Sequence, residues 1–385
     1  MRKNFLPFSL PTIGKKEILA VNKVLKSGWL TTGLVTHRFE KEFADYIGAK
    51  YALAVNSGTA ALHLALDTIG VKQGDEVIVP TLTFTATAEV VIHLGAKPVF
   101  VDIDPLTFNI DPSKIEKKIN SRTKAIIPVH IGGQPCDMDE IRKIARKYNL
   151  RIIEDAAHAL PSSYKDKMVG TMSDLTCFSF YPTKSITTGE GGMITTNDKK
   201  WIRRIEVMRL HGMSHQAWKR YAKGGSWKYQ ILYAGWKYNL TDIASALGIE
   251  QLKQCNYFFK RRKVIAEKYN KKFREFEEIQ IPYTTAEKQH AWHLYIIKLN
   301  LKKLTISRDR FIEEMRSRNI GTSVHFIPLH LQPAYKKYGY QTKDFPEANK
   351  VFKQIVSLPI YPKMTTSDIK AVINAVIDII RKYRK

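Results

Sequence analysis

Short apolar runs alternate with segments of helix length between residues 50 and 200, and this alternation constrains the fold more than any other feature. The first five runs are rich in Val and Ile and recur about every 25 residues, as expected of strands buried on both faces of a mostly parallel sheet. Two further runs extend the series. The sequence therefore predicts a seven-stranded α/β core, with strands at Ala52–Val55, Glu76–Val79, Pro98–Val101, Ala125–Val129, Arg151–Glu154, Thr176–Phe180 and Gly192–Thr195.

Helices are expected between these strands and after them. Apolar residues at helical spacing predict crossover helices at Thr59–Ile69, Phe84–Leu94 and Met138–Tyr148. After about residue 200 the pattern changes to longer helices with few strands, which is typical of a smaller α+β domain. We therefore expect a large domain over residues 1–250 and a small one over residues 251–385. After residue 200 the sequence predicts helices at Trp201–Leu210, Phe258–Phe276, Arg308–Arg318 and Ser367–Tyr383, and strands at Ala291–Leu299 and Thr322–Phe326.

The composition is that of a folded protein in a reducing compartment. With 44% hydrophobic and 25% charged residues among 385, the chain falls in the globular range. No apolar run approaches the ~18 residues needed to span a bilayer, and Pro7 and Pro11 interrupt the apolar stretch near the N-terminus. Cys136, Cys177 and Cys255 form no close pair, so a disulfide framework, a zinc ribbon and an iron–sulfur cluster all lack ligands. We expect a cytoplasmic protein without a membrane partner.

The charge balance is unusual, because 62 basic and 36 acidic side chains give a net charge of +26. Such a field attracts nucleic acids, acidic membranes and phosphorylated small molecules alike. The basic residues are dispersed, with concentrations at 260–263 and 381–385 that are typical of solvated helix faces and a frayed terminus. A nucleic-acid-binding regulator would need a recognition helix or an aromatic and basic platform, and only dispersed charge is found. We expect no nucleic-acid partner, and a basic regulator without catalysis is the alternative class.

A first polar segment, Ser57-Gly58-Thr59-Ala60, joins the first predicted strand to the first helix. Small residues at such a turn let backbone amides and hydroxyls point at an anion, and the helix N-terminus adds a favourable dipole. The segment lacks the lysine of a P-loop and the GxGxxG spacing, so neither a nucleoside triphosphatase nor a dinucleotide enzyme is supported. The segment can be a small phosphate cradle or an ordinary helix cap.

Two further segments carry titratable groups. Asp155 follows a predicted strand, at the edge where α/β sheets bind ligands, and His158 follows three residues later. Alternatively, Asp155 could cap a turn and His158 could be a packed residue without a role in a site. Lys184 lies between a strand and a glycine-rich stretch and is flanked by hydroxyls. If Lys184 is partly desolvated, its pKa falls and its amine can attack a carbonyl to form a Schiff base.

The three segments together match the needs of one cofactor. Pyridoxal phosphate (PLP) requires a phosphate cradle, a carboxylate that keeps the pyridine nitrogen protonated, and a lysine for the aldehyde. The sequence supplies these groups in the order SGT, DAAH and SFYPTK, and Phe84 offers an aromatic cover for the ring. We therefore predict that the chain binds PLP and its amino form, PMP.

The ordered motifs also resemble a known family. NSGTAALHLAL, PTLTFTATAEVV, PVHIGGQPCDMD, EDAAHA, SFYPTKSITTGEGGMI, KYNLTDIASALG and VHFIPLHLQPAY look like the nucleotide-sugar aminotransferases of the DegT/DnrJ type, and the similarity extends from about Phe8 to the last helix. The resemblance implies the aspartate-aminotransferase fold, which is fold type I of PLP enzymes. It further implies a homodimer with a shared active site. Glutamate would be the amino donor and a keto-sugar nucleotide the acceptor, in a ping-pong Schiff-base mechanism.

The resemblance implies a role for each matching residue. Lys184 would form the Schiff base and move the proton, Asp155 would pair with the pyridinium nitrogen, and His158 would face the 3′-oxygen of the cofactor. Phe84 would lie over the ring. The phosphate would be bound by Ser57, Gly58, Thr59, Ala60 and Ser179, and by Asn239 of the neighbouring subunit.

On the sugar side, the resemblance implies contacts from Thr31, His325 and His330. The stretch His211–Tyr221 and the run KYNLTDI are similar to relatives that aminate C4 of the sugar, whereas HLQPAY also occurs in relatives that aminate C3. We prefer C4 and keep C3 as the alternative. Where the family reads close to PGYKYN this chain reads AGWKYN, which leaves the shape of this interface loop and the substrate open.

Paired histidines raise a metal hypothesis, at His290 and His293 and again at His325 and His330. No carboxylate accompanies either pair at ligand spacing, so no metal is expected. The first pair flanks Trp292 in a predicted strand and should point to opposite faces of a sheet. Relatives in which histidine replaces the lysine are sugar dehydratases, and this chain keeps the lysine.

Overall fold

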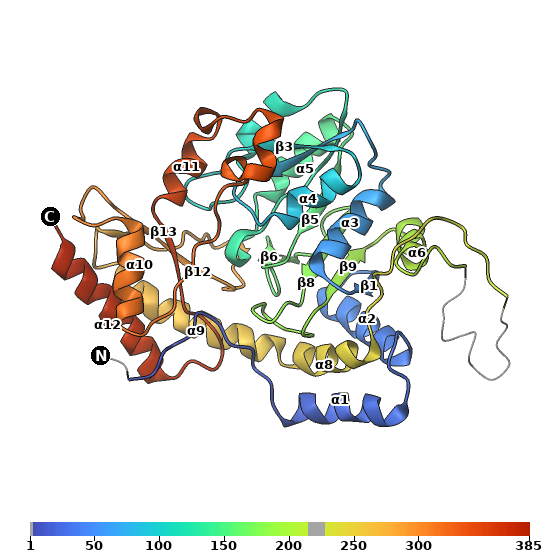
Figure 1. Cartoon of the computed structure of the whole chain (residues 1–385), viewed down its shortest axis with the longest axis horizontal. Helices are drawn as coiled ribbons and strands as arrows, with labels where there is room; N and C mark the ends of the chain where they lie inside the picture. The colour runs from blue at the N-terminus through green and yellow to red at the C-terminus, as the bar shows by residue number, and fades with distance from the viewer. Residues whose placement is uncertain (1–2, 215–227) are drawn as a thin grey trace.

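The computed structural model describes residues 3–214 and 228–385, and at its centre is a seven-stranded sheet (Figure 1). The strand order is β1-β9-β8-β5-β4-β2-β3, in which β9 is antiparallel to both neighbours and the other pairs are parallel. The predicted strand number and mostly parallel class are confirmed. The strands are β1 (Tyr51–Val55), β2 (Glu76–Pro80), β3 (Lys97–Val101), β4 (Thr123–Ile126), β5 (Arg151–Asp155), β8 (Leu175–Ser179) and β9 (Gly192–Thr196).

Helices cover both faces of this sheet. Successive side chains of a strand point to opposite faces, so alternate residues of each strand enter separate cores. Val77 and Val79 of β2 join one core, whereas Ile78 joins another. The three predicted crossover helices are confirmed as α3, α4 and α5, to within two residues at each end. The first face carries α3 (Gly58–Thr68), α4 (Ala86–His93) and α6 (Lys199–Met208), and the second carries α2 (Leu34–Ile47), α5 (Met138–Lys147) and α8 (Asp242–Lys253).

An N-terminal helix that the sequence did not predict, α1 (Lys15–Ser27), lies against α8 (Figure 1). Only Glu17 and Val24 of this helix are buried, whereas its apolar residues Ile18, Leu19 and Leu25 are exposed. The buried contact is polar, since Gln251 Nε2 donates to Glu17 Oε1 at 3.0 Å. The α2 helix likewise lies outside the predicted elements, although Phe39 and Phe43 of α2 are fully buried against the sheet.

A second, smaller sheet lies in the C-terminal part of the chain, with strand order β10-β12-β13. Its apolar face packs on three helices that the sequence predicted to within a few residues. In a separate three-stranded ladder, β6 pairs with β11 on one side and with β7 on the other. These elements are β10 (Ile279–Gln280), β12 (Tyr295–Leu299), β13 (Ile355–Leu358), α9 (Cys255–Phe273), α10 (Arg308–Ser317), α12 (Thr366–Tyr383), β6 (Ser163–Tyr164), β7 (Lys167–Met168) and β11 (Lys288–Gln289).

Two predicted strands in this region need correction. The strand expected at Ala291–Leu299 begins only at Tyr295, because the amides of Ala291 and Leu294 donate to the carbonyls of Gly133 and Gly132 instead. The strand expected at residues 322–326 is absent from the described residues. That segment makes one isolated bridge, between Ser323 and Ser357, and then bends over the cavity described below.

The chain does not divide cleanly at residue 250, which lies inside α8. Residues after that point return to the large core, where Leu329, Tyr335, Phe345 and Val351 pack with apolar residues of the seven-stranded sheet. They come from two short 3₁₀ turns and from α11 (Pro346–Phe352). The division into domains 1–250 and 251–385 stays a prediction. Among the described residues, no helix has the length and apolar character to cross a membrane.

Candidate active site

A cavity of about 540 Å³ opens at the carboxyl ends of β5 and β8, beside the N-terminus of α3. This is the edge at which parallel α/β sheets bind ligands. Nine of the thirteen predicted site residues line it, although they are distributed over some 270 positions of the sequence. They are Ser57, Gly58, Thr59, Phe84, Asp155, His158, Ser179, Lys184 and His325.

Lys184 reaches the cavity from the loop that follows β8. Its backbone amide donates to the Tyr181 carbonyl at 2.9 Å, which closes a turn in this loop. Burial of the ammonium group lowers the pKa of Lys184 to about 8, although the nearby Asp155 carboxylate acts in the opposite direction. A lysine with such a pKa has a sizeable neutral fraction near neutrality, and its amine can therefore act as a nucleophile.

Asp155 ends β5 and is 6% exposed. Its Oδ2 accepts from Thr87 Oγ1 at 2.8 Å, and its Oδ1 accepts from the Ala157 amide at 3.1 Å. Burial raises the pKa of this carboxyl, while the two hydrogen bonds and the Lys184 charge partly offset the effect. Within the described chain, its hydrogen-bond donors are neutral. A protonated pyridine nitrogen would supply the missing positive charge, so this carboxylate fits PLP.

The turn from β1 into α3 forms a tight cradle. Ser57 caps α3, with its Oγ accepting from the Ala60 amide at 3.0 Å. A Cβ atom on Gly58 would lie 2.9 Å from Ser179 Cβ, so only glycine allows this approach of α3 to β8. The first turn of a helix leaves amides without internal partners, and its dipole favours anions. The cradle therefore fits the phosphate of PLP.

Aromatic and imidazole rings form the rest of the wall. The His158 ring packs on His293, with centroids 4.5 Å apart, and stacks on Phe326 at 5.9 Å. The Gly132 amide lies 3.3 Å from His158 Nδ1, which makes Nδ1 the acceptor and Nε2 the protonated nitrogen. Burial and the Lys184 charge hold the pKa of His158 well below its ordinary range. His325 shares this effect, and its pKa falls to about 4.

Several cavity residues were not predicted from the sequence, among them Phe8, His293 and Phe326. His293 had been considered only as part of a metal pair, in a strand that the structure does not form there. Its ring is 4% exposed, and its Nδ1 has no hydrogen-bond partner among the described residues. Each of the three arrives from a segment distant in sequence from Lys184, so no local pattern marks it. No group of three or more potential metal ligands occurs in the part of the chain described.

Four predicted site residues do not line the cavity. His330 is 3% exposed, and both ring nitrogens have partners, Thr81 Oγ1 at 2.7 Å and Asn349 Oδ1 at 3.0 Å. Ala60 lies in the first turn of α3, where its amide is already bound to Ser57. Thr31 and Asn239 lie together elsewhere, as described next. The roles of these residues stay predictions.

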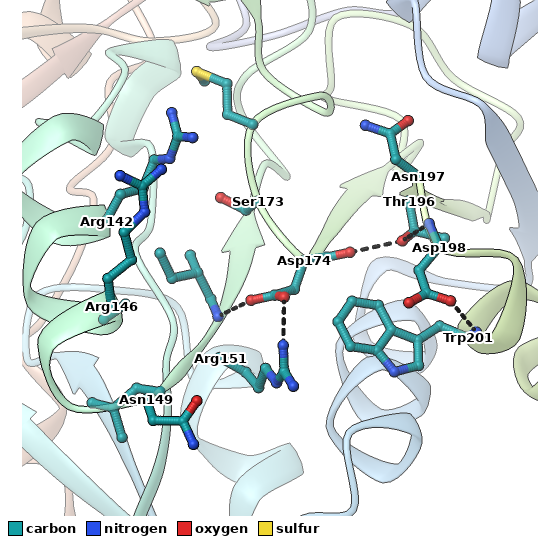
Figure 2. A pocket seen from close by; sticks show the side chains of 14 residues that line it. Arg142, Arg146, Asn149, Arg151, Ser173, Asp174, Thr196, Asn197, Asp198 and Trp201 are labelled. Atoms are coloured by element: carbon teal, nitrogen blue, oxygen red, sulfur yellow. Dashed lines mark hydrogen bonds and ion pairs between the residues drawn. The ribbon is translucent and has the colours of Figure 1, made fainter.

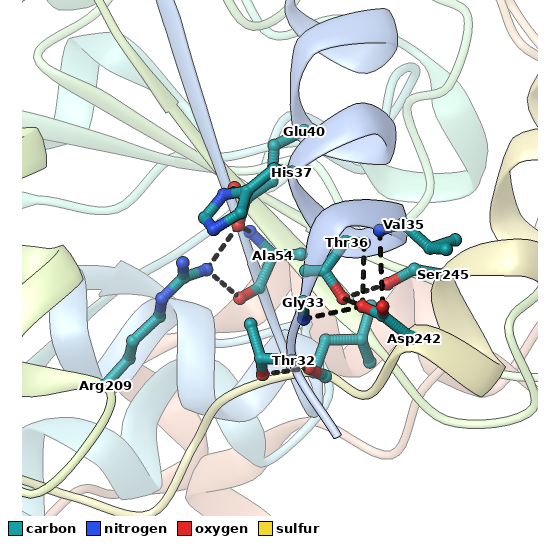
Figure 3. A network of polar contacts seen from close by, with 11 residues as sticks. Thr32, Gly33, Val35, Thr36, His37, Glu40, Ala54, Arg209, Asp242 and Ser245 are labelled. Atoms are coloured by element: carbon teal, nitrogen blue, oxygen red, sulfur yellow. Dashed lines mark hydrogen bonds and ion pairs between the residues drawn. The ribbon is translucent and has the colours of Figure 1, made fainter. Parts of the chain in front are cut away.

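A buried carboxylate holds the segment of Thr31 against that of Asn239 (Figure 3). Asp242, at the start of α8, accepts from the Gly33 amide at 2.7 Å and from the amide and hydroxyl of Thr36 at 2.9 and 2.6 Å. It therefore caps α2 from a distant helix. The Asn239 amide group donates to the Thr32 hydroxyl at 2.7 Å in the same region.

A second buried pair ties α2 to β1 in the same view (Figure 3). Arg209 and Glu40 are 3% and 6% exposed at their side chains and form an ion pair. Arg209 Nη1 also donates to the Ala54 carbonyl at 2.7 Å, and Glu40 accepts from the Ala54 amide at 3.0 Å. Burial alone would raise the pKa of Glu40, but Arg209 and His37 outweigh it and lower that pKa. The pair fixes β1, which leads into the turn at Ser57 and the N-terminus of α3.

The chain has close relatives along its whole length. A model of the DegT/DnrJ/EryC1/StrS aminotransferase family matches residues 11–377. The spore coat polysaccharide biosynthesis protein SpsC of Bacillus subtilis is 50% identical over 382 residues, which make up 99% of this chain and 98% of SpsC.

Solved structures agree with this match. Spr1654 of Streptococcus pneumoniae, known in PLP and PMP forms, is 34% identical with a TM-score of 0.91 and covers 98% of this chain and 99% of its own. PseC of Helicobacter pylori, an aminotransferase involved in the biosynthesis of pseudoaminic acid, is 29% identical with a TM-score of 0.92. The match covers 99% of this chain and 100% of PseC.

The fold and the cavity define a PLP-dependent enzyme of fold type I. The chain belongs to the DegT/DnrJ/EryC1/StrS aminotransferase family. It is a sugar aminotransferase that uses PLP and PMP, as the sequence predicted.

Proposed function

We propose that this enzyme moves an amino group from glutamate to the C4 keto group of a nucleotide-linked sugar, in a cytoplasmic pathway of polysaccharide synthesis. The observation that carries the proposal is the Lys184 amine beside the buried Asp155 carboxylate, in one cavity with a phosphate cradle. SpsC and PseC, whose names place them in polysaccharide and sugar-acid synthesis, support the substrate class. The free, buried cysteines of the described chain fit a reducing compartment.

Each cavity residue has a proposed task. When bound, PLP supplies an aldehyde and a ring that stabilises negative charge on the reacting carbon. Lys184 anchors the aldehyde and carries the proton between the reacting carbons. Asp155 keeps the proton on the pyridine nitrogen. His158, neutral with its proton on Nε2, donates to the 3′-oxygen, and Phe84 covers the ring face.

We propose that the enzyme works as a homodimer in which each subunit completes the other's site. Large apolar side chains are exposed around the cavity mouth, including Phe84 at 56% and Tyr181 at 48%. Such exposure is typical of an interface. Asn239 and Thr31 lie outside this chain's own cavity, which supports a role for them in the site of the partner subunit.

The position of amination can be tested with a substrate panel. Purified enzyme with glutamate and a set of 4-keto and 3-keto nucleotide sugars should form an amino sugar from the 4-keto compounds, detected by mass spectrometry. Turnover of 3-keto compounds alone would contradict amination at C4 and indicate amination at C3. Part of the evidence for C4, within His211–Tyr221, falls at residues 215–221, which lie outside the described residues.

Asp155→Asn should lower turnover by about 10²-fold while cofactor still binds, because the ring nitrogen loses the charge that keeps it protonated. Thr87→Val is a matched control, since it removes one hydrogen bond to the same carboxylate but leaves the charge. The control should lose less than about 10-fold. Cofactor absorbance and steady-state rates check both variants. Equal losses in the two variants would show that orientation, and not charge, is what Asp155 provides.

A further inference from the structure

A second hollow, of about 520 Å³, lies at the opposite edge of the central sheet (Figure 2). It forms where β5 and β8 begin and β9 ends, beside the last turns of α5. Arg151 begins β5 here, and Asp155 ends the same strand in the PLP cavity. Four residue steps of a strand cover roughly 13 Å, so the hollow is separate from the reaction site.

Two arginines on one wall of the hollow lack an acidic partner. Arg142 and Arg146 are one turn apart on α5, and their guanidinium groups stand together in Figure 2. In residues 3–214 and 228–385 neither makes an ion pair, although the charge of Arg142 acts weakly on Asp139. By contrast, Lys143 and Lys147 of the same helix pair with acidic side chains outside the hollow, at 4.0 and 3.1 Å.

The acidic residues that line the hollow are engaged by the fold. Asp174 accepts from the Ile152 amide at 2.8 Å and from Arg151 at 3.3 Å. Asp198 caps α6 by accepting from the amides of Lys200 and Trp201. Neither carboxylate pairs with the two α5 arginines in the described chain, so their positive charges are available to an anion that enters the hollow.

This charge continues into an adjoining hollow of about 780 Å³, which shares Arg151 and Trp201 with the first. Its walls add Lys199, Lys200 and Arg203, and also Arg204, which pairs with Asp67. The Arg151 guanidinium lies over the Trp201 ring, 5.4 Å from its centroid, and is thereby held in place. Part of the net charge of +26 is thus concentrated on one face.

We propose that the first hollow binds a small anion that carries a diphosphate group. Planar guanidinium groups offer paired donors to phosphate oxygens, and three of them line a space of a size typical for small ligands. Free diphosphate and a nucleoside diphosphate share this chemistry. The proposal is independent of the sugar position aminated in the PLP cavity.

Titration calorimetry on the PLP-loaded enzyme tests this site with diphosphate and with uridine diphosphate. Arg142→Gln with Arg146→Gln should weaken diphosphate binding at least about 10-fold, because two charge-assisted contacts are lost. Lys143→Gln with Lys147→Gln removes the same charge from the same helix and should change the affinity for diphosphate less than about 2-fold. Tighter binding of uridine diphosphate than of diphosphate, also lost in the arginine variant, would identify a nucleotide as the source, and equal binding would identify diphosphate itself.

Several outcomes would overturn the proposal. Unchanged diphosphate binding in the arginine variant would exclude the hollow as the binding site. Equal weakening in both variants would show that net charge, and not this site, determines the binding. Binding of a DNA or RNA oligomer far tighter than that of diphosphate, with the same arginine dependence, would replace the small anion with nucleic acid. Turnover in the arginine variant should stay at the wild-type level, which separates this site from the PLP cavity.

Discussion

Lys184→Ala is expected to lower the rate of transamination by about 10⁴-fold while the protein still folds. In the mechanism that we propose, the substitution removes both the amine that anchors the cofactor aldehyde and the base that moves the proton, so both halves of the reaction should fail together. Lys184 makes no ion pair in the described chain. Burial removes water from its ammonium group, which destabilises the charged form and lowers the pKa of Lys184 to about 8. Removing it should therefore leave stability unchanged or improve it slightly.

The measurement has two parts, and each has a control. Rates are followed separately for glutamate and for the keto sugar, and borohydride reduction followed by mass spectrometry shows whether cofactor is fixed to residue 184. Lys165→Ala removes a surface lysine that pairs with Asp139 and should leave both readouts at the wild-type level. Near-normal turnover in Lys184→Ala, or borohydride labelling at another lysine, would remove Lys184 from the mechanism.

The sequence predicted the central sheet because its strands are buried on both faces. A run such as Glu76–Pro80 has every residue buried, so it is apolar throughout and stands out from its surroundings. In contrast, α1 contacts the protein through Glu17 and a hydrogen bond to Gln251, and its apolar residues Ile18, Leu19 and Leu25 are exposed, so it lies outside the core that the sequence pattern predicted. The strand predicted at 322–326 was wrong for a related reason. Phe326 lines the cavity and Val324 packs against the large core, so neither residue joins a sheet.

The cavity was predictable to the extent that its residues sit at strand ends. Ser57, Asp155 and Ser179 each lie at the carboxyl end of a strand, and the topology of a parallel sheet brings such ends together. His293 and Phe326 come from the C-terminal part of the chain, and their place depends on how that part packs on the large sheet. Tertiary contacts of this kind leave no local pattern in a single sequence.

The second large effect concerns stability, where Arg209→Met is expected to cost about 3–5 kcal/mol of unfolding free energy. The substitution leaves the buried Glu40 with only His37 beside it and removes the Arg209 donor to the Ala54 carbonyl. The double variant Glu40→Gln with Arg209→Met removes both charges, and it should recover much of the loss. Urea unfolding followed by circular dichroism measures Arg209→Met, the single variant Glu40→Gln and the double variant. A double variant as unstable as the sum of the single ones would show that packing, and not the buried charge, sets the cost.

The pH dependence of the same variants separates charge from packing. In the wild type the pKa of Glu40 is lowered, so its contribution to stability is present above the unfolded-state pKa and is lost as pH falls through the folded-state value. Without Arg209, only His37 opposes the effect of burial, so we expect the pKa of Glu40 to rise and protonation to relieve the buried charge as pH falls. The stability deficit of Arg209→Met relative to wild type should therefore shrink steadily from pH 8 toward pH 5. A deficit that is constant over this range would contradict a charged Glu40 as its cause, because a packing defect does not titrate.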